Sequence, residues 1–246
     1  MKILLAPAET KREGGDFSPY KKENFAFDEI FQVKDLIVRN YTDFIANNSI
    51  EKLSHWFGLK NLKECQKYSD DMLIKPTMKA ILRYTGVAFD ALDYENLDIK
   101  TQKYCDENII LFSNLFGPIS ASDLIPDYKF KQGAVLDSID VVKEYKVNTK
   151  EFLDSYLGDE VVDLRAGFYD KFYKMKASIN VVTYKFLKEG KVVSHWAKHY
   201  RGLVVKEIAN NNIRNFEQLM TLKIEGLSLL EIQEKKNIKT LVMEIV

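Results

Sequence analysis

Five short apolar runs, separated by longer segments with helical periodicity, constrain the fold of this chain more than any other feature. The runs cover residues 2–6, 109–112, 161–164, 179–187 and 239–246. Apolar stretches of this length, bounded by turn residues, are typical of strands. Because they are distributed along the whole chain with helical segments between them, we expect a mixed α/β (α+β) fold around a central mixed sheet.

The segments between the apolar runs predict helices. Apolar residues recur at three- and four-residue spacing over 27–46. Further helices are expected over 77–84, 97–107 and 195–210, the last with Ser194 as its N-cap. The turn Lys188-Glu189-Gly190-Lys191 makes 179–193 a hairpin, and residues 27–92 are expected to form a helical lobe. With no linker and no repeat, residues 1–246 should form one compact domain.

The bulk composition excludes several classes of protein. The formal net charge is zero, which argues against a uniformly basic protein. No apolar run approaches the roughly 20 residues of a membrane span. The two cysteines do not make a disulfide framework, so we expect a cytoplasmic protein with no membrane partner. No obligate protein partner is evident.

Charge is nevertheless concentrated in one part of the chain. Residues 165–206 carry ten basic and two acidic side chains, a net charge of +8, which the rest of the chain balances. Such a segment attracts an anion, which can be a nucleic acid, a phosphorylated small molecule, an acidic membrane surface or the acidic part of the protein itself. The chain offers three places where an anion could bind.

The first place is residues 49–68, where Ser49 begins one short helix, Gly58 makes a turn and a second helix follows. This pattern resembles a helix-hairpin-helix DNA-binding element. Gly58 allows a backbone with positive φ, and backbone N–H groups at the turn can hold a phosphate, with Lys60 and Lys63 adding charge. The alternative is an ordinary corner between two helices.

The second place is the loop after the strand at 109–112, which carries Ser113, Asp123, Tyr128 and Lys129. Loops that follow a strand often build sites in α/β folds. Arg165 stands at a similar junction after the strand at 161–164.

The third place is the start of the helix at 195–210. His195, Lys198 and Arg201 lie at or near its N-terminus, where the helix dipole favours anions. The group is either a cradle for phosphate or carboxylate or a solvated basic face. His195 and His199 are also spaced as metal ligands, but His55 is the only other histidine. No metal and no cofactor are therefore expected.

Several segments resemble the YaaA family of bacterial peroxide stress proteins. Residues 3–9 are similar to the family's strand followed by Ser-Pro-Ala-Lys, with Ala6 and Glu9 at the serine and lysine positions. Residues 84–92 resemble Gly-x-x-Tyr-x-Gly-Leu, with Phe89 in place of tyrosine.

Two further segments carry the most specific part of this resemblance. Residues 111–128 are similar to Leu-Ser-Gly-Leu-Tyr-Gly-Leu-Leu-Arg-Pro-Leu-Asp-Leu-Ile-x-x-Tyr, although Ser120 and Lys129 stand where the family usually has arginine. Residues 197–202 are similar to Ala-Lys-x-Ala-Arg-Gly. The resemblance implies one mixed α/β domain with a helix-hairpin-helix element and a basic cleft. It also implies DNA binding with little sequence preference and protection from hydrogen peroxide, with less free iron and less oxidative DNA damage.

Three functions remain open from the sequence. The first is binding of double-stranded or structured DNA. Its expected contacts are Gly58, Lys60, Lys63, Lys129, Arg165, His195, Lys198 and Arg201. The second is an enzyme acting on a small phosphorylated or nucleotide-like substrate. Its candidate catalytic residues are Asp123, Tyr128, Lys198 and Arg201, with Ser113 and Arg165 nearby. The third is a module whose basic patch binds an acidic protein.

Overall fold

The computed structural model describes residues 1–137, 139–193 and 195–246, with the backbone alone for His195. Its strands are β1 (Lys2–Leu5), β2 (Thr77–Lys79), β3 (Ile109–Ser113), β4 (Gly117–Ser120), β5 (Leu124–Pro126), β6 (Glu160–Leu164), β7 (Asn180–Lys188), β8 (Lys191–Val192), β9 (Leu227–Lys235) and β10 (Ile238–Ile245). Its α-helices are α1 (Phe31–Ala46), α2 (Ile50–Phe57), α3 (Leu62–Lys67), α4 (Ala80–Arg83), α5 (Val87–Leu92), α6 (Ile99–Asn108), α7 (Val141–Asn148), α8 (Lys150–Tyr156), α9 (His195–Asn210) and α10 (Phe216–Thr221).

The main sheet is mixed, as the apolar runs predict. Its order is β4-β3-β1-β6-β7-β10-β9, and β8 pairs with β7. The five central strands run parallel, whereas β4 and β9 at the two edges run antiparallel to their neighbours. The predicted α/β class and the β7–β8 hairpin are therefore confirmed.

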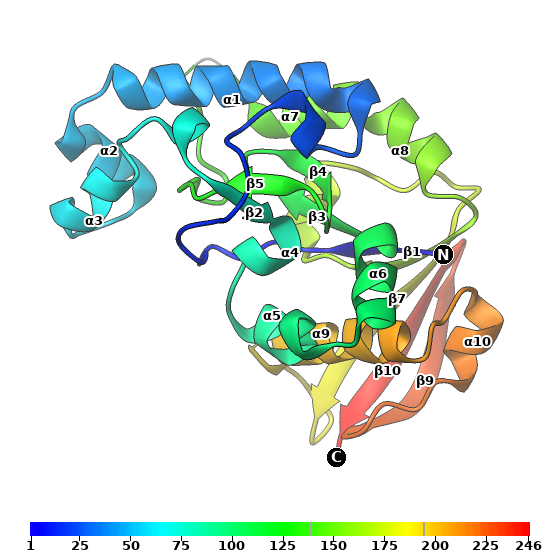
Figure 1. Cartoon of the computed structure of the whole chain (residues 1–246). Helices are drawn as coiled ribbons and strands as arrows, with labels where there is room; N and C mark the ends of the chain where they lie inside the picture. Colours follow the sequence, from blue (N-terminus) through cyan, green and yellow to red (C-terminus); the bar gives the residue numbers. More distant parts are fainter. Residues whose placement is uncertain (138, 194) are drawn as a thin grey trace.

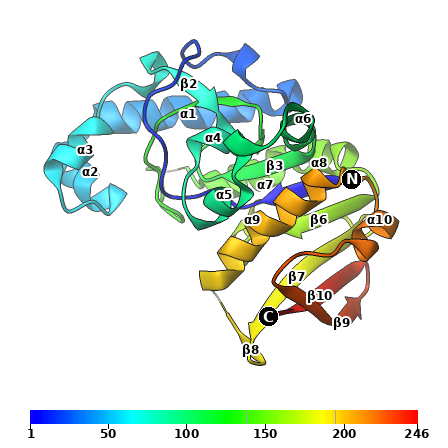
Figure 2. The ribbon, with the colours of Figure 1, turned by 60° about the horizontal axis from the view of Figure 1, so that its bottom comes forward.

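Helices cover both faces of this sheet. Figures 1 and 2 show α1, α7 and α8 on one side of the central strands and α5, α6 and α9 on the other. Every residue of β3 is buried, which agrees with its uninterrupted apolar sequence. The main core lies between the sheet and these two helical layers.

The strand order places a switch point at β1 and β6, which are adjacent in the sheet. The chain leaves β1 and next enters the main sheet on one side, at β3, whereas it leaves β6 toward the other side, at β7. In open α/β sheets, the loops diverge at such a point and leave a crevice beyond the carboxyl ends of the strands. Ligands bind there in many α/β proteins.

The prediction of a helix over 77–84 is wrong for its first half. Residues 77–79 form β2, which pairs antiparallel with β5, and only residues 80–83 are helical. Thr77 is fully buried and also pairs with Phe17. Tertiary pairing therefore overrides the local helical pattern, so the lobe expected over 27–92 is not all helical. The N-cap predicted at Ser194 lies outside the described residues.

The helices α2 and α3 project from one side of the molecule (Figures 1 and 2). The side chain of Ser49 accepts a hydrogen bond from the backbone of Lys52, so Ser49 caps α2 as expected. Gly58 ends α2 in the left-handed conformation, with a φ of 69°. The two short helices and the glycine turn of residues 49–68 are thus present.

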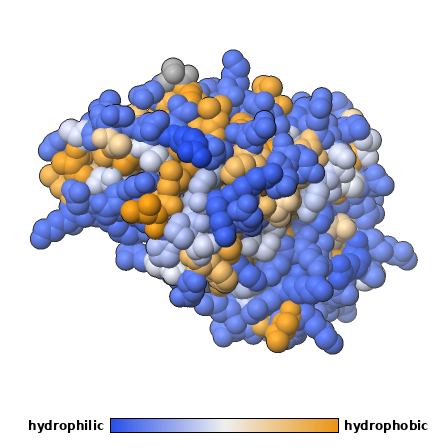
Figure 3. Space-filling model, turned by 45° about the horizontal axis from the view of Figure 1, so that its top comes forward, coloured by the Kyte–Doolittle hydropathy of each residue, from blue (hydrophilic) through white to orange (hydrophobic). Residues whose placement is uncertain are grey.

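The surface carries hydrophobic side chains in scattered groups rather than in one large patch on the face seen in Figure 3. None of the helices in the described part of the chain combines the length and the apolarity that crossing a membrane requires.

The helix α9 packs against α5, and Gly202 lies at their closest approach. A Cβ atom on this residue would overlap the carbonyl oxygen of Ala88 and would lie 3.0 Å from the Cβ of Ala91. Gly202 therefore allows α9 to lie directly on α5, and this contact fixes where the first turns of α9 present their side chains.

We predict that Gly202→Ala destabilises the fold. Alanine is ordinarily favoured over glycine inside a helix by about 1 kcal/mol, but here its methyl group forces α9 away from α5. Overpacking of this kind should lower the free energy of unfolding by about 1–3 kcal/mol in denaturant titrations. Gly167→Ala is the matched control, because a Cβ there meets no atom within 4 Å. Equal stability of the two variants would contradict the proposed role of Gly202.

Candidate functional site: a cationic cavity at the switch point

A cavity of about 480 Å³ opens beyond the carboxyl ends of β1 and β6. Its walls come from residues 5–10 after β1, residues 85–89 at the start of α5, and Leu164, Ala166 and Tyr169 after β6. Gln132, Lys198 and Arg201 complete the lining. The volume lies within the range of about 300–1,000 Å³ that is usual for small-molecule sites. A cavity large enough for a small molecule therefore lies where the strand order predicts a crevice.

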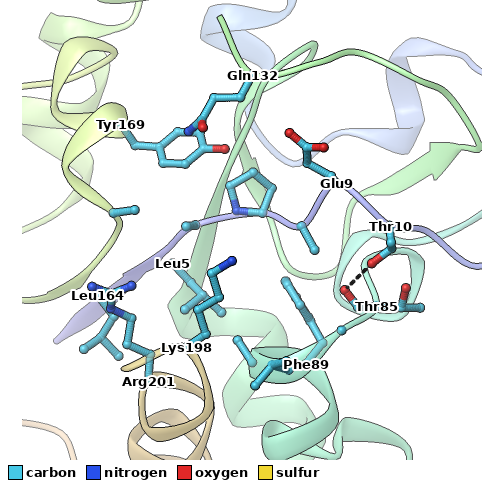
Figure 4. A pocket seen from close by; sticks show the side chains of 17 residues that line it. Leu5, Glu9, Thr10, Thr85, Phe89, Gln132, Leu164, Tyr169, Lys198 and Arg201 are labelled. Atoms are coloured by element: carbon cyan, nitrogen blue, oxygen red, sulfur yellow. Dashed lines mark hydrogen bonds between the residues drawn. The ribbon is translucent and has the colours of Figure 1, made fainter. Parts of the chain in front are cut away.

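Most of the cavity wall is apolar, and its polar side chains lie in separate groups around it. Figure 4 shows Tyr169 and Gln132 on one side and Lys198 and Arg201 on the other, with the segment after β1 between them. The wall near Glu9 is held by a hydrogen bond of 3.0 Å from Thr10 Oγ1 to the carbonyl of Thr85. An apolar wall with a few converging polar groups is the usual pattern of a ligand site.

Lys198 and Arg201 supply the positive charge of the cavity. They are three residues apart on α9, so they share one face of the helix. Lys198 is exposed and Arg201 is half-buried. Burial lowers the pKa of Arg201, and the negative charge of Asp163 raises it in part. Among the residues that the structure describes, neither cation forms a hydrogen bond or a salt bridge.

Asp163, the carboxylate whose charge acts on Arg201, is already paired with Arg165. Arg165 donates from Nε to Asp163 Oδ1 at 2.9 Å and from Nη2 to Oδ2 at 2.7 Å. Its remaining nitrogen donates to the carbonyls of Tyr169 and Tyr173, and its guanidinium stacks 4.6 Å from the ring centroid of Phe112. Arg165 is therefore a buried structural residue next to the cavity, and each of its three guanidinium nitrogens donates a hydrogen bond.

Tyr169 is a site residue that sequence reasoning missed. It is only 5% exposed, and its hydroxyl points into the cavity beside Gln132 (Figure 4). The hydroxyl faces the side chains of Asn114 and Gln132, and burial raises its pKa strongly. Asn114 Oδ1 is buried and has no hydrogen-bond partner in the described structure. The only available signal was the position of Tyr169 after β6, which it shares with Arg165.

Tyr128 belongs to a separate buried network behind the cavity. Its hydroxyl lies 2.8 Å from the hydroxyls of both Ser113 and Tyr84. Lys11 Nζ lies 4.2 Å from the centroid of the Tyr128 ring, and burial lowers the pKa of this amine to about 7. Because Tyr128 and Ser113 do not line the cavity, they are not in position to contact a ligand there.

Asp123 is also buried away from the cavity. Its two oxygens accept hydrogen bonds from the backbone of Ala26 at 2.8 Å and of Ser120 at 3.1 Å. Burial raises its pKa to about 6, against the opposing charge of Lys34. Of the four candidate catalytic residues, the structure brings only Lys198 and Arg201 together in the cavity.

The remaining predicted DNA contacts lie around α2 and α3. Lys60 and Lys63 are exposed, and Lys129 is half-buried. The N–H groups of Gly58 and Leu59 donate to the carbonyls of His55 and Ser54, so these amides are engaged within the turn. The side chain of His195 lies outside the described structure. The described residues contain no cluster of three or more histidine, cysteine, aspartate or glutamate side chains placed to hold a metal ion.

The fold and the cavity together define a mixed α/β protein with a cationic site at the switch point of its sheet. A family model described as peroxide stress protein YaaA matches residues 1–233, and the chain belongs to this family.

Relatives resemble the chain over its full length. An uncharacterized protein of Campylobacter jejuni is 44% identical over 246 residues, covering 100% of this chain and 99% of the relative. A UPF0246 protein of Corynebacterium glutamicum is 30% identical over 253 residues, covering 99% and 100%. A UPF0246 protein of Fusobacterium nucleatum is 24% identical over 249 residues, covering 96% and 97%.

We predict that substitution by methionine lowers the free energy of unfolding strongly at Arg165 and little at Arg201. Arg165→Met leaves the Asp163 carboxylate and two carbonyls without their donor, so the free energy of unfolding should fall by about 3–5 kcal/mol. Arg201→Met removes a partly desolvated cation that has no close partner among the described residues, so stability should stay within about 1 kcal/mol or rise. Denaturant titrations of both variants measure this. A large loss of stability in Arg201→Met would mean that Arg201 is structural.

Proposed function

We propose that the chain binds DNA with little sequence preference during peroxide stress. The contacts would come from two groups of cations on one side of the molecule. One group is Lys60 and Lys63 beside the α2–α3 turn, acting as a helix-hairpin-helix element, and the other is Lys198 and Arg201 at the cavity mouth. Charge of this kind binds phosphates without reading bases.

The observation that supports this proposal most directly is a loop that joins the two groups. A Cβ atom on Gly58 would lie 3.6 Å from the side chain of Lys131, and Trp56 Nε1 donates to the carbonyl of Val135 at 2.8 Å. The next residue after Lys131, Gln132, lines the cavity. The loop that carries Lys129 and Lys131 therefore connects the α2–α3 turn to the cavity.

The orientation of α9 also supports one basic side. Both ribbon views have the N-terminal end of α9 facing the same side of the molecule as α2 and α3 (Figures 1 and 2). The β7–β8 hairpin, which carries Lys185, Lys188 and Lys191, ends next to this point in the chain. These lysines would add diffuse attraction for a polyanion.

Because the amides of Gly58 and Leu59 are engaged within the turn, side chains rather than the turn backbone would carry the phosphate contacts on α2–α3. Lys60 and Lys63 then act as exposed point charges. Arg165 contributes by holding the loop after β6, and not by touching DNA. Less oxidative damage to DNA and less free iron in peroxide-treated cells are the physiological effects that we expect.

The chemistry of the two cysteines favours a protective role over peroxide sensing. Cys65 and Cys105 are both fully buried. Burial raises the pKa of Cys65, and it raises the pKa of Cys105 to about 12. Peroxide attacks the thiolate, which is scarce at neutral pH when the pKa is high and is shielded here.

The DNA-binding proposal predicts a steep dependence on salt. Duplex affinity, measured by fluorescence anisotropy with two unrelated sequences, should be similar for both and should fall as salt rises from 50 to about 200 mM. The double variant Lys60→Ala/Lys63→Ala should reduce the slope of log Kd against log salt by up to about two.

The control for this experiment is Lys235→Ala/Lys239→Ala, which removes the same charge from exposed positions on β9 and β10. It should leave the slope nearly unchanged. Equal losses in the two double variants would indicate attraction by net charge alone. Affinity that does not depend on salt would contradict the proposal.

The state of the cysteines predicts that the folded protein reacts slowly with thiol reagents. At pH 8, an aromatic disulfide reagent should label both cysteines of the denatured chain within minutes and neither in the native protein over the same time. Pretreatment with hydrogen peroxide should leave duplex affinity unchanged. Rapid labelling of one native thiol, together with altered DNA binding after peroxide, would indicate a redox sensor instead.

A further inference from the structure

The cavity holds more recognition chemistry than the binding of a DNA backbone requires. A duplex phosphate on the protein surface needs an exposed cation, and Lys198 alone would supply it. Arg201 instead lies half-buried in the cavity wall and Tyr169 is almost fully buried, with its hydroxyl aimed into the same space. Tyr169 is reached only from inside the cavity, and Arg201 is only partly accessible, so a ligand that enters the cavity can contact both groups more fully than a duplex phosphate at the cavity mouth can.

The electrostatics of the cavity select an anion. Asp163 is taken by the two contacts from Arg165, so the charge of Arg201 has no close protein partner among the described residues. A partly desolvated and unpaired cation costs stability, and this cost is relieved when an anion enters. Arg201 and Lys198 can together hold one phosphate, with Arg201 as the planar donor and Lys198 as the mobile charge.

The opposite side of the cavity selects a neutral polar group. The Tyr169 hydroxyl and the Gln132 amide both line the cavity, and each can donate or accept a hydrogen bond. Buried polar groups of this kind are normally satisfied by a ligand or by ordered water. The ligand should therefore carry hydrogen-bonding atoms on the side away from its phosphate.

The middle of the cavity selects an apolar or planar body. Leu5, Pro7 and Phe89 line it together with small side chains. The carboxylate of Glu9 at the wall disfavours a second phosphate and can accept a hydrogen bond from an amino or hydroxyl group. A single phosphate, a planar body and polar edges within about 480 Å³ are the features of one nucleotide.

We propose that this cavity is a binding site for a single nucleotide unit, a nucleoside monophosphate. Its phosphate would lie on Lys198 and Arg201, its planar base against Phe89, and its polar edge at Tyr169 and Gln132. The unit can be a free nucleotide, or a nucleotide turned out of a DNA strand, since both present the same chemistry. The site is distinct from the charges on α2 and α3 that would bind duplex phosphates.

The test is calorimetric titration of the full chain with 5′-AMP, with adenosine and inorganic phosphate as partial probes. We expect 5′-AMP to bind more tightly than either part. Arg201→Met should weaken 5′-AMP by at least about tenfold, because a charged hydrogen bond is lost. Tyr169→Phe, which keeps the ring packing, should weaken it by about three- to tenfold.

Matched variants separate this proposal from the binding of duplex DNA. Lys60→Ala/Lys63→Ala should weaken duplex DNA and leave 5′-AMP binding unchanged, whereas Tyr169→Phe should do the reverse. Lys235→Ala/Lys239→Ala should affect neither. Circular dichroism of each variant verifies folding, and Tyr169→Phe keeps the test valid if Arg201→Met does not fold.

Competition identifies the source of the nucleotide. If a short single strand, or a duplex with one unpaired nucleotide, displaces 5′-AMP in a way that depends on Tyr169, the unit comes from DNA. If only free nucleotides compete, the ligand is a free nucleotide. No binding of 5′-AMP at millimolar concentration would overturn the proposal, as would binding that neither Arg201→Met nor Tyr169→Phe weakens.

Discussion

The pair between Arg165 and Asp163 is the interaction on which the site depends. It lies directly after β6, where the chain turns away from the sheet, and four hydrogen bonds from the guanidinium side chain hold the turn. Two of these bonds reach the carbonyls of Tyr169 and Tyr173, so the pair also fixes the segment that presents the Tyr169 hydroxyl. By occupying both oxygens of Asp163, Arg165 leaves the charge of Arg201 available to a ligand. One buried cation thus pairs with the carboxylate that would otherwise be the nearest partner of a second cation.

The second constraint is the close contact of α9 with α5. Lys198 lies one turn before Gly202 and Arg201 directly precedes it, so their position over the cavity depends on how near α9 approaches Ala88. This gives a physical reason for the sequence Ala-Lys-His-Tyr-Arg-Gly. Ala197 and Gly202 are buried against neighbouring elements, whereas the two cations between them face the cavity. The residues of this segment that pack against α5 therefore also determine where its two cations lie in the cavity wall.

The sequence predicts the framework well because strands buried on both faces leave an apolar signature that needs no tertiary information. Residues 2–6, 109–112 and 161–164 all become central strands. The pattern fails at Thr77, where pairing with Phe17 and with β5 decides the conformation. It also says nothing of β9, whose residues are mostly exposed and whose pairing with β10 is set by the turn between them.

The site could be predicted only in part, because the sequence shows local spacing but not the tertiary partners of each side chain. Residue type and spacing identify Lys198 and Arg201 because two cations on one turn of a helix are a local pattern. Residue type and spacing do not distinguish these two cations from Arg165 or Asp123. Arg165 is paired with Asp163, two residues away, and Asp123 accepts a hydrogen bond from the backbone of Ala26, nearly a hundred residues away. Tyr169 and Gln132 carry no charge and stand in no motif, so only the folded chain brings them to the cavity.

The cations of the basic segment differ in whether a carboxylate already pairs with them. Residues 165–206 carry a net charge of +8, but Arg165 is neutralised by Asp163 and Lys206 lies 3.4 Å from Asp93. Lys171, Lys174, Lys176, Lys185, Lys188 and Lys191 are the lysines that lie between Arg165 and α9. They can attract a polyanion from a distance, since long-range attraction needs charge but no defined geometry. A specific contact needs a cation that no protein group already pairs, and within the described part of the chain Arg201 meets this condition because Asp163 is paired with Arg165.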